Sequence, residues 1–353
     1  MPDALPQLGR RLLLTGLGSL PLTGLAGEVR AMASAAAPVD MATILIAGPD
    51  GGSLDRWGRT VQPALAQGLP PEATLRLNSV GAADGVTGAN QFLARGEPDG
   101  HTVLLAPGDA AMAWLVGDPR AQYDVARWVP VMAGTTAAVV VVRPDATGKR
   151  DVRIATTGPA TADLPALLGL DILGWPAVPV VLPTQEARFA ALRQGAVDAV
   201  FLRGHKVTEL LAPMIRSGLV PLFSLGAQDE TGKPIRCPGL PDVPTLPEAY
   251  TAARGPMPEG PLYDSWRSSA GAAQLDFALV LPHLTPAATV ALWRRAGTEA
   301  AAALDVRRIA LELGVRLIGG ADAAAAGKAL IAPPQARAEL RRWLAIRFDW
   351  RPA

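Results

Sequence analysis

Two strand–turn–helix units within residues 44–105 most constrain what this chain can fold into. In the first, an apolar segment at 44–47 leads through Gly-Pro-Asp-Gly-Gly-Ser at 48–53 into a helical pattern. The second is a glycine-broken turn at 81–88 that opens another helical pattern. Each turn leaves free backbone N–H groups at the start of a helix, where the helix dipole favours negative charge. Two such turns from one sheet predict a pocket for a small anion.

Apolar segments of strand length alternate with helical patterns along the rest of the chain. This alternation predicts an α/β architecture with largely parallel sheets. The run at 129–142 ends in four valines, a pattern of strands that are buried on both faces. We expect this run and a strand at 277–281 to be the two crossings between two lobes. Lobe 1 would then comprise residues 36–140 plus 277–353, and lobe 2 would comprise residues 141–276.

The same patterns predict the individual elements. The expected strands are 43–47, 74–78, 102–106, 154–156, 178–182, 197–202 and 277–281. The expected helices are 54–67, 86–95, 162–170, 185–194, 207–217, 287–304 and 335–346. The proline- and glycine-rich stretch at 228–259 predicts a long surface loop.

The first 35 residues have the order of an export signal. Arg10 and Arg11 precede an apolar run at 12–26, and small residues follow at 31–35. This order is typical of a secretory signal, and adjacent arginines also fit a twin-arginine signal. The alternative is an ordinary buried first helix. We expect residues 1–35 to be removed and the mature chain to be periplasmic.

Composition and motifs exclude several classes of function. A formal net charge of +1 argues against a nucleic-acid surface. Cys237 is the only cysteine, which rules out an intramolecular disulfide, and its polar surroundings in the sequence predict exposure to solvent. The chain has no Gly-x-Ser-x-Gly elbow, no complete dinucleotide-binding glycine motif at a strand–helix turn, and no spacing typical of metal ligands. We therefore expect neither enzymatic activity nor a cofactor.

Four polar turns are candidate ligand contacts, and each has a structural alternative. The glycines of the first turn also suit a tight turn that requires positive φ. Ser53, Asp84 and Thr184 each suit a helix N-cap, and so does the hydroxyl-rich turn at 156–161. Because ligands of open α/β sheets lie at the carboxyl ends of strands, the four turns together predict a cleft.

Five motifs stand in order along the chain. They are Gly-Gly-Ser at 51–53 with Asp55 and Arg59, Asn78 with the turn at 83–88, Pro-Asp-Gly-His-Thr at 98–102, the helix–Gly–strand stretch at 192–201, and Leu-Pro-Asp-Val-Pro-Thr-Leu-Pro-Glu-Ala at 240–249. This order resembles that of the Bug proteins, the periplasmic solute receptors of tripartite tricarboxylate transporters.

The resemblance implies a two-lobe periplasmic binding protein of type II, in which each lobe is a mostly parallel sheet flanked by helices. Two crossings would join the lobes, which would close on a small carboxylate and deliver it to the membrane subunits of a transporter. We expect a monomer without a nucleic-acid partner. The implied ligand contacts, with Asp84 added from the second turn, are Gly51, Gly52, Ser53, Asp84, Gly85, Thr157, Thr161 and Thr184.

The chain also departs from the family's pattern. Ala47 and Gly48 stand where the family usually has a proline and an aromatic residue, and Leu164 replaces a histidine. Asp84 replaces a glycine, and an acidic side chain beside an anion site opposes a dicarboxylate by like-charge repulsion. Two alternatives stay open. One is a sensing receptor of the same fold for a neutral or cationic solute, and the other is an exported enzyme that uses Asp55 or Asp84.

Overall fold

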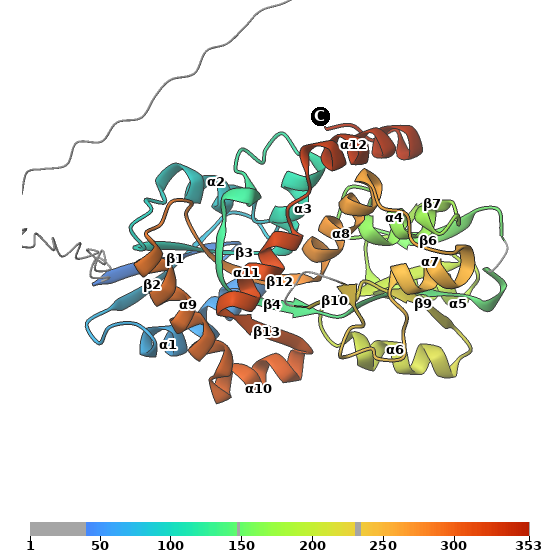
Figure 1. The fold of residues 1–353 in the computed structure, drawn as a ribbon. Coiled ribbons are helices and arrows are strands. Elements are labelled where there is room, and N and C mark those ends of the chain that lie inside the picture. Colours follow the sequence, from blue (N-terminus) through green and yellow to red (C-terminus); the bar gives the residue numbers. More distant parts are fainter. Residues whose placement is uncertain (1–39, 147–148, 230–233, 353) are drawn as a thin grey trace, which may run out of the picture. The chain divides into compact units, whose positions relative to one another are not determined.

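The computed structural model describes residues 40–146, 149–229 and 234–352, which fold into α/β layers built on two main sheets (Figure 1). The predicted export signal at 1–35 lies outside the described residues. Within the described ranges, no helix combines the length and apolarity needed to span a membrane.

The first sheet has six strands in the order β13-β4-β12-β3-β1-β2. Its strands are β1 (Met41–Ala47), β2 (Thr74–Val80), β3 (Thr102–Ala106), β4 (Val129–Thr136), β12 (Leu275–Leu281) and β13 (Val315–Gly319). β1 is parallel to β2 and β3, whereas β12 is antiparallel to β3 and β4, and β13 is antiparallel to β4. β1 to β4 therefore all run in one direction.

The second sheet has five strands in the order β7-β6-β8-β5-β9. Its strands are β5 (Ala138–Val142), β6 (Val152–Thr156), β7 (Ala177–Val181), β8 (Ala199–Arg203) and β9 (Val220–Ser224). β6 is parallel to β7 and β8, and β5 is antiparallel to β8 and β9. A small third sheet pairs β10 (Ala227–Gln228) with β11 (Pro234–Ile235). Both main sheets are mixed, although most strands in each share a direction.

Helices cover both main sheets. Those packed on the first sheet are α1 (Ser53–Gln67), α2 (Val86–Arg95), α3 (Gly108–Val116), α9 (Ala287–Ala302), α10 (Leu304–Leu313) and α11 (Gly320–Ala329). Those packed on the second are α4 (Leu164–Ile172), α5 (Gln185–Arg193), α6 (Val207–Arg216) and α7 (Leu246–Arg254). The remaining helices are α8 (Pro261–Gln274), α12 (Pro334–Phe348) and two single 3₁₀ turns, Val125–Arg127 and Pro144–Ala146.

The central strands are apolar because they are buried on both faces. Ile44 and Ile46 of β1 and Leu104 and Leu105 of β3 are fully buried, and Val139 of β5 is equally inaccessible. Each such side chain contributes about 1.5–3 kcal/mol relative to an exposed one. The continuous apolar runs that predicted these strands reflect burial on both faces of each sheet, which here includes β5 although it is antiparallel to both neighbours.

Several predicted elements differ from the observed ones. The run at 129–142 is two strands in different sheets, so the chain crosses at Ala137 rather than along one long strand. The predicted loop at 228–259 contains α7, which begins with a capping box between Thr245 and Glu248. α3 was not predicted because seven of its nine residues are buried, which leaves no amphipathic period. α8, β9 and β13 were also not predicted.

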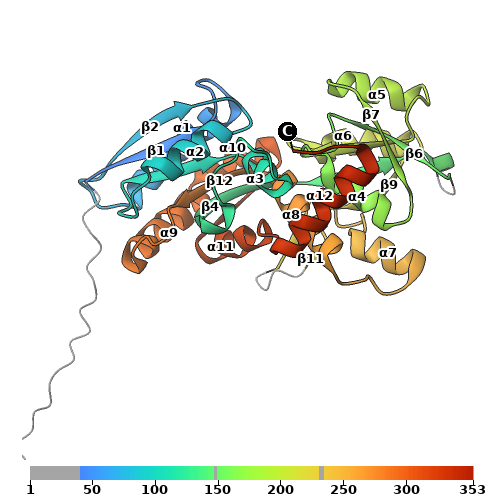
Figure 2. The same cartoon turned by 90° about the horizontal axis from the view of Figure 1, so that it is seen from above.

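α8 packs against α3, α4 and α12 (Figure 2). α12 also reaches α4, since Arg347 donates to both carboxylate oxygens of Asp171 at 2.7 and 3.1 Å, and Trp343 Nε1 donates to the same group at 3.0 Å. The C-terminal helix is thereby tied to a helix of the second sheet. The predicted division into 36–140 plus 277–353 and 141–276 stays a prediction.

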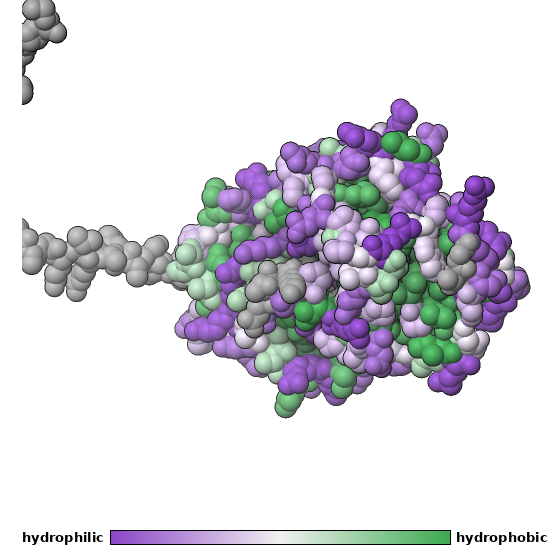
Figure 3. All heavy atoms as spheres, turned by 45° about the vertical axis from the view of Figure 1, so that its right-hand side comes forward, coloured by the Kyte–Doolittle hydropathy of each residue, from purple (hydrophilic) through white to green (hydrophobic). Residues whose placement is uncertain are grey.

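On the face drawn in Figure 3, hydrophobic residues form separate patches among hydrophilic ones. Some exposed hydrophobic surface is normal for a globular protein, and this view by itself identifies no docking surface.

Candidate functional site

The candidate site lies on the two sheet edges where the chain passes from β4 into β5. β4 ends at Thr136 and β5 begins at Ala138. β1, β2 and β3 run in the direction of β4, so their carboxyl ends lie on that edge of the first sheet. β6, β7 and β8 run against β5, so their carboxyl ends lie on the adjoining edge of the second sheet. We call these the first edge and the second edge; open α/β sheets bind ligands at such positions.

The turn between β1 and α1, on the first edge, is organised by the buried carboxylate of Asp55. Gly51 N–H donates to Asp55 Oδ2 at 3.1 Å, and Arg59 Nε donates to the same oxygen at 2.8 Å. Ser79 Oγ donates to Oδ1 at 2.9 Å. These bonds, led by that of Arg59, hold the pKa of Asp55 below its ordinary value. The N–H of Gly52 donates to a carbonyl of the same turn at 3.1 Å, so both predicted glycine donors are used internally.

Two features of this turn bear on the alternatives left open by the sequence. Gly51 has a φ of 71°, as the tight-turn alternative requires. Ser53 is the first residue of α1 rather than its N-cap, which is Gly52. The exposed Ser53 hydroxyl makes no hydrogen bond to any described residue. Of the three predicted contacts in this turn, Ser53 has the donor that is open to a solute.

The second turn, between β2 and α2, is also closed on itself. Asp84 Oδ1 accepts from Val86 N–H at 3.2 Å, and Oδ2 accepts from Arg120 Nη1 at 3.0 Å. Gly85 is the N-cap of α2 at a φ of 74°, and its N–H donates to the Ala82 carbonyl at 3.1 Å. Asp84 therefore lies one residue before the cap position and pairs with a cation.

A third turn on the first edge, between β3 and α3, was missed by the sequence reasoning. It places Asp109 in the first turn of α3, with its side chain open to solvent. Surrounding protein partly excludes water from this carboxyl and raises its pKa, an effect that Asp163 and Asp84 reinforce and Arg203 opposes. The signal that could have found it is the Pro-Gly-Asp sequence directly after a buried strand.

On the second edge, Asp163 organises the hydroxyl-rich turn that follows β6. It is 1% exposed. Its Oδ2 accepts from Thr157 N–H at 2.7 Å, from Thr157 Oγ1 at 2.9 Å and from Thr156 Oγ1 at 3.1 Å. Thr161 Oγ1 donates to the Gly158 carbonyl at 2.8 Å and lies 3.0 Å from Thr157 Oγ1. The predicted contacts Thr157 and Thr161 are thus within one network.

Two arginines complete this edge, and neither was identified from the sequence. Arg188 Nη1 lies 3.8 Å from Asp163 Oδ2, while its Nε donates to the Leu182 carbonyl at 3.0 Å. Arg203, the last residue of β8, approaches Asp163 Oδ1 through Nε at 3.4 Å. Both arginines are far from Asp163 in the sequence, so no local pattern predicts that they approach its carboxylate.

Thr184, the last predicted contact, has the structural role that was its alternative. Its Oγ1 accepts from Ala187 N–H at 3.2 Å, so it is the N-cap of α5. The side chain is exposed beside β7, so the cap does not bury it.

Asp276, at the start of β12, links the elements around the two edges. It accepts from Trp57 Nε1 of α1 at 2.6 Å, and His205 Nε2 of the β8–α6 turn lies 3.1 and 3.0 Å from its two oxygens. This carboxylate raises the pKa of His205 above its ordinary value. Asp276, in the first sheet, therefore connects the two sheets through its contact with His205, in addition to the covalent connections between them.

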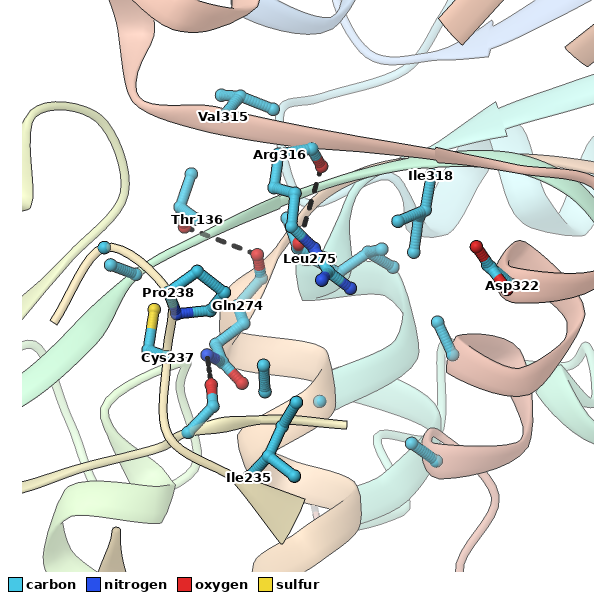
Figure 4. A pocket seen from close by; sticks show the side chains of 18 of the residues that line it. Thr136, Ile235, Cys237, Pro238, Gln274, Leu275, Val315, Arg316, Ile318 and Asp322 are labelled. Atoms are coloured by element: carbon cyan, nitrogen blue, oxygen red, sulfur yellow. Dashed lines mark hydrogen bonds between the residues drawn. The ribbon is translucent and has the colours of Figure 1, made fainter. Parts of the chain in front are cut away.

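A cavity of about 780 Å³ lies beside the crossings and is distinct from these turns (Figure 4). Its walls include Thr136, Gln274, Arg316 and the loop around Cys237. Gln274 Nε2 donates to the Gly226 carbonyl, between β9 and β10, at 2.6 Å, and Thr136 Oγ1 donates to the Gln274 carbonyl at 3.3 Å. All eight predicted ligand contacts are described, and none of them lines this cavity.

The prediction that Cys237 is exposed is wrong. Its side chain is buried in a small hydrophobic cluster with Leu240 and Val243, and burial raises the pKa of the thiol. The same cluster contains Val139, Leu202 and Leu211, which are far from Cys237 in the sequence, so the polar residues next to Cys237 in the sequence did not reveal its burial. Among the described residues, no group of three or more His, Cys, Asp or Glu side chains could hold a metal ion.

No family model and no curated protein sequence matches the chain. Among solved structures, it is similar to a TctC solute-binding protein from Polaromonas without ligand, at 18% identity, 87% coverage of this chain, 98% coverage of that chain and a TM-score of 0.64. Lower TM-scores of 0.48 are found for the periplasmic binding protein BugD (16% identity, 87% and 97% coverage) and for MatC from Rhodopseudomonas palustris with bound malate (20% identity, 87% and 98% coverage).

The Polaromonas structure shows the fold of this chain. The chain has the two-lobe α/β fold of a TctC solute-binding protein, with two sheets, their flanking helices and two crossings. The fold class predicted from the sequence is confirmed. The eight predicted ligand contacts stay predictions. The glycine N–H groups at 51, 52 and 85 are hydrogen-bonded within their own turns, whereas Ser53, Thr157, Thr161 and Thr184 place hydroxyls on the two edges.

Proposed function

We propose that this chain, which shares the fold of a TctC solute-binding protein, is a Bug-family receptor that closes on a small organic acid by a hinge motion. It is exported by its first 35 residues and delivers the acid to a tripartite tricarboxylate-type transporter. The observation that carries the proposal is the meeting of turns from both sheets at the first and second edges. Closure of two lobes on such edges is a common hinge mechanism.

The second edge favours an anionic solute. Arg188 and Arg203 share one nearby buried carboxylate, Asp163, which leaves an excess of one positive charge. Charge-assisted hydrogen bonds from a guanidinium to a carboxylate are about twice as strong as neutral ones. Ser53 adds an open hydroxyl from the first edge. The receptor therefore adds guanidinium donors to the backbone N–H and hydroxyl donors that the sequence predicted.

Native mass spectrometry of protein purified without denaturation tests the binding function. We expect a retained small acid that is displaced by an excess of another acid. The same acid at 100 times its dissociation constant should raise the free energy of unfolding by about 2.7 kcal/mol. Protein that retains no small molecule, and that no acid of a broad panel stabilises, would contradict the proposal.

Export and delivery are tested separately. Deletion of residues 1–35 should leave the chain in the cytoplasm, and Arg10→Lys with Arg11→Lys should do so only if export follows the twin-arginine route. Deletion of the whole chain should abolish cellular uptake of the retained acid. Uptake that continues unchanged would contradict delivery to a transporter while leaving binding intact.

A further inference from the structure

We propose that Arg203 binds the carboxylate of the solute, whereas Asp84 and Asp109 exclude a second carboxylate, so that the site takes monocarboxylates whose far end donates a hydrogen bond. This specificity rests on the proposed receptor function and deepens it. A receptor with this specificity would bind monocarboxylates in preference to dicarboxylates.

Arg203 is the cation of the second edge with donors to spare. Asp163 makes three hydrogen bonds to its own turn through Oδ2, and Arg203 reaches only the other oxygen, through Nε at the long distance of 3.4 Å. The two Nη atoms of Arg203 make no hydrogen bond to any described residue, and the side chain is 33% exposed. A guanidinium in this state can donate two parallel bonds to an incoming carboxylate.

Arg188 is less available than Arg203. Its side chain is 14% exposed, and its Nε is committed to the Leu182 carbonyl. It therefore supports Asp163 from within the protein and offsets that charge. Arg203 is left as the group that faces solvent.

The first edge has the opposite charge. Arg120 pairs with both Asp84 and Asp118, and Asp109 has no ion pair among the described residues. Three carboxylates against one guanidinium leave a formal charge of −2. A second carboxylate on the solute would meet this surface and be repelled.

The two edges influence one another electrostatically. Arg203 lies two residues before His205, whose Nε2 is 3.1 and 3.0 Å from the carboxylate oxygens of Asp276 in the first sheet, so Arg203 lies where the two edges adjoin. Arg203 favours the charged form of Asp109 and so lowers the pKa of that carboxyl, whereas Asp84 raises it. A carboxylate at one end and an ammonium or hydroxyl at the other satisfies both edges. The ammonium or hydroxyl would donate to the carboxylate of Asp84 or Asp109, because an ionised carboxylate is a strong hydrogen-bond acceptor.

Three four-carbon probes that differ only at the far end test this specificity by calorimetry at pH 7: succinate, 4-hydroxybutyrate and 4-aminobutyrate. We expect the unmodified mature chain to bind the hydroxy and amino acids at least tenfold more tightly than succinate. The double variant Asp84→Asn/Asp109→Asn should bind succinate at least tenfold better and 4-aminobutyrate at least tenfold worse.

Arg203→Gln should weaken binding of every probe at least tenfold. Arg203→Lys keeps the charge but lacks the planar fork, so it should bind with intermediate affinity and provides a second variant if Arg203→Gln unfolds. The matched control is Arg193→Gln at the end of α5, which has no ion pair among the described residues and should leave all three affinities unchanged.

Equal or tighter binding of succinate by the unmodified chain overturns the specificity, and so does unchanged affinity in folded Arg203→Gln. Failure of all three probes to bind also overturns it for a solute of this size. The receptor function is decided independently by the solute retained in native mass spectrometry, so the two failures are distinguishable.

Discussion

The turn after β1 and the turn after β6 are built on the same plan, with a buried aspartate that accepts hydrogen bonds from the turn and from arginine. They differ in the arginines. Arg59, the partner of Asp55, is 61% exposed and also pairs with Asp50, whereas the partners of Asp163 are more buried and outnumber it. The first turn is therefore a closed structural unit, and the second has positive charge left for a solute.

Removal of the Asp163 carboxylate should have the largest effect on stability. Asp163→Ala leaves Arg188 and Arg203 without their counter-ion and Thr157 N–H without an acceptor, so we expect a loss of about 3–5 kcal/mol. Urea unfolding monitored by circular dichroism measures it. The control, Asp305→Ala, removes an exposed carboxylate and should change stability by less than about 0.5 kcal/mol.

Asp55→Asn should cost less, about 1–3 kcal/mol, because the exposed Arg59 regains water when its partner is neutralised. Asn also keeps one oxygen that can accept from Gly51 N–H. The same urea measurement applies. A loss as large as that of Asp163→Ala would show that the exposure of the partner arginine does not set the cost, and the contrast between the two turns would fail.

The contribution of Asp55, in the turn after β1, to the free energy of unfolding should decrease at acid pH. The folded-state pKa of Asp55 is depressed, so its contribution is fully present above the unfolded value of about 3.9 and is lost as pH falls through the folded value. The stability difference between the unmodified chain and Asp55→Asn should therefore shrink between pH 5 and pH 3. Urea midpoints measured across this range test the sign, and a difference that grows on acidification would contradict it.

The sequence predicted the framework of the first edge more accurately than the chemistry of the second. Alternating apolar and amphipathic segments separated by glycine turns located α2 and β3 to the residue, because local patterns determine such units. The role of Asp163 depends on Arg188 and Arg203, which only the parallel pairing of β6 with its neighbours brings close. Hidden tertiary contacts of this kind also explain the wrong expectation for Cys237.

Thr184→Ala should have the smallest effect and separates a cap from a ligand contact. Loss of the bond from Ala187 N–H should cost about 1 kcal/mol, and Thr184→Ser should restore it, since serine is an equally good N-cap. Solute affinity should change by less than about threefold, because the hydroxyl acts on α5. If affinity instead falls tenfold in the alanine variant and returns with serine, the hydroxyl contacts the solute, and the second edge would extend from Arg203 to β7.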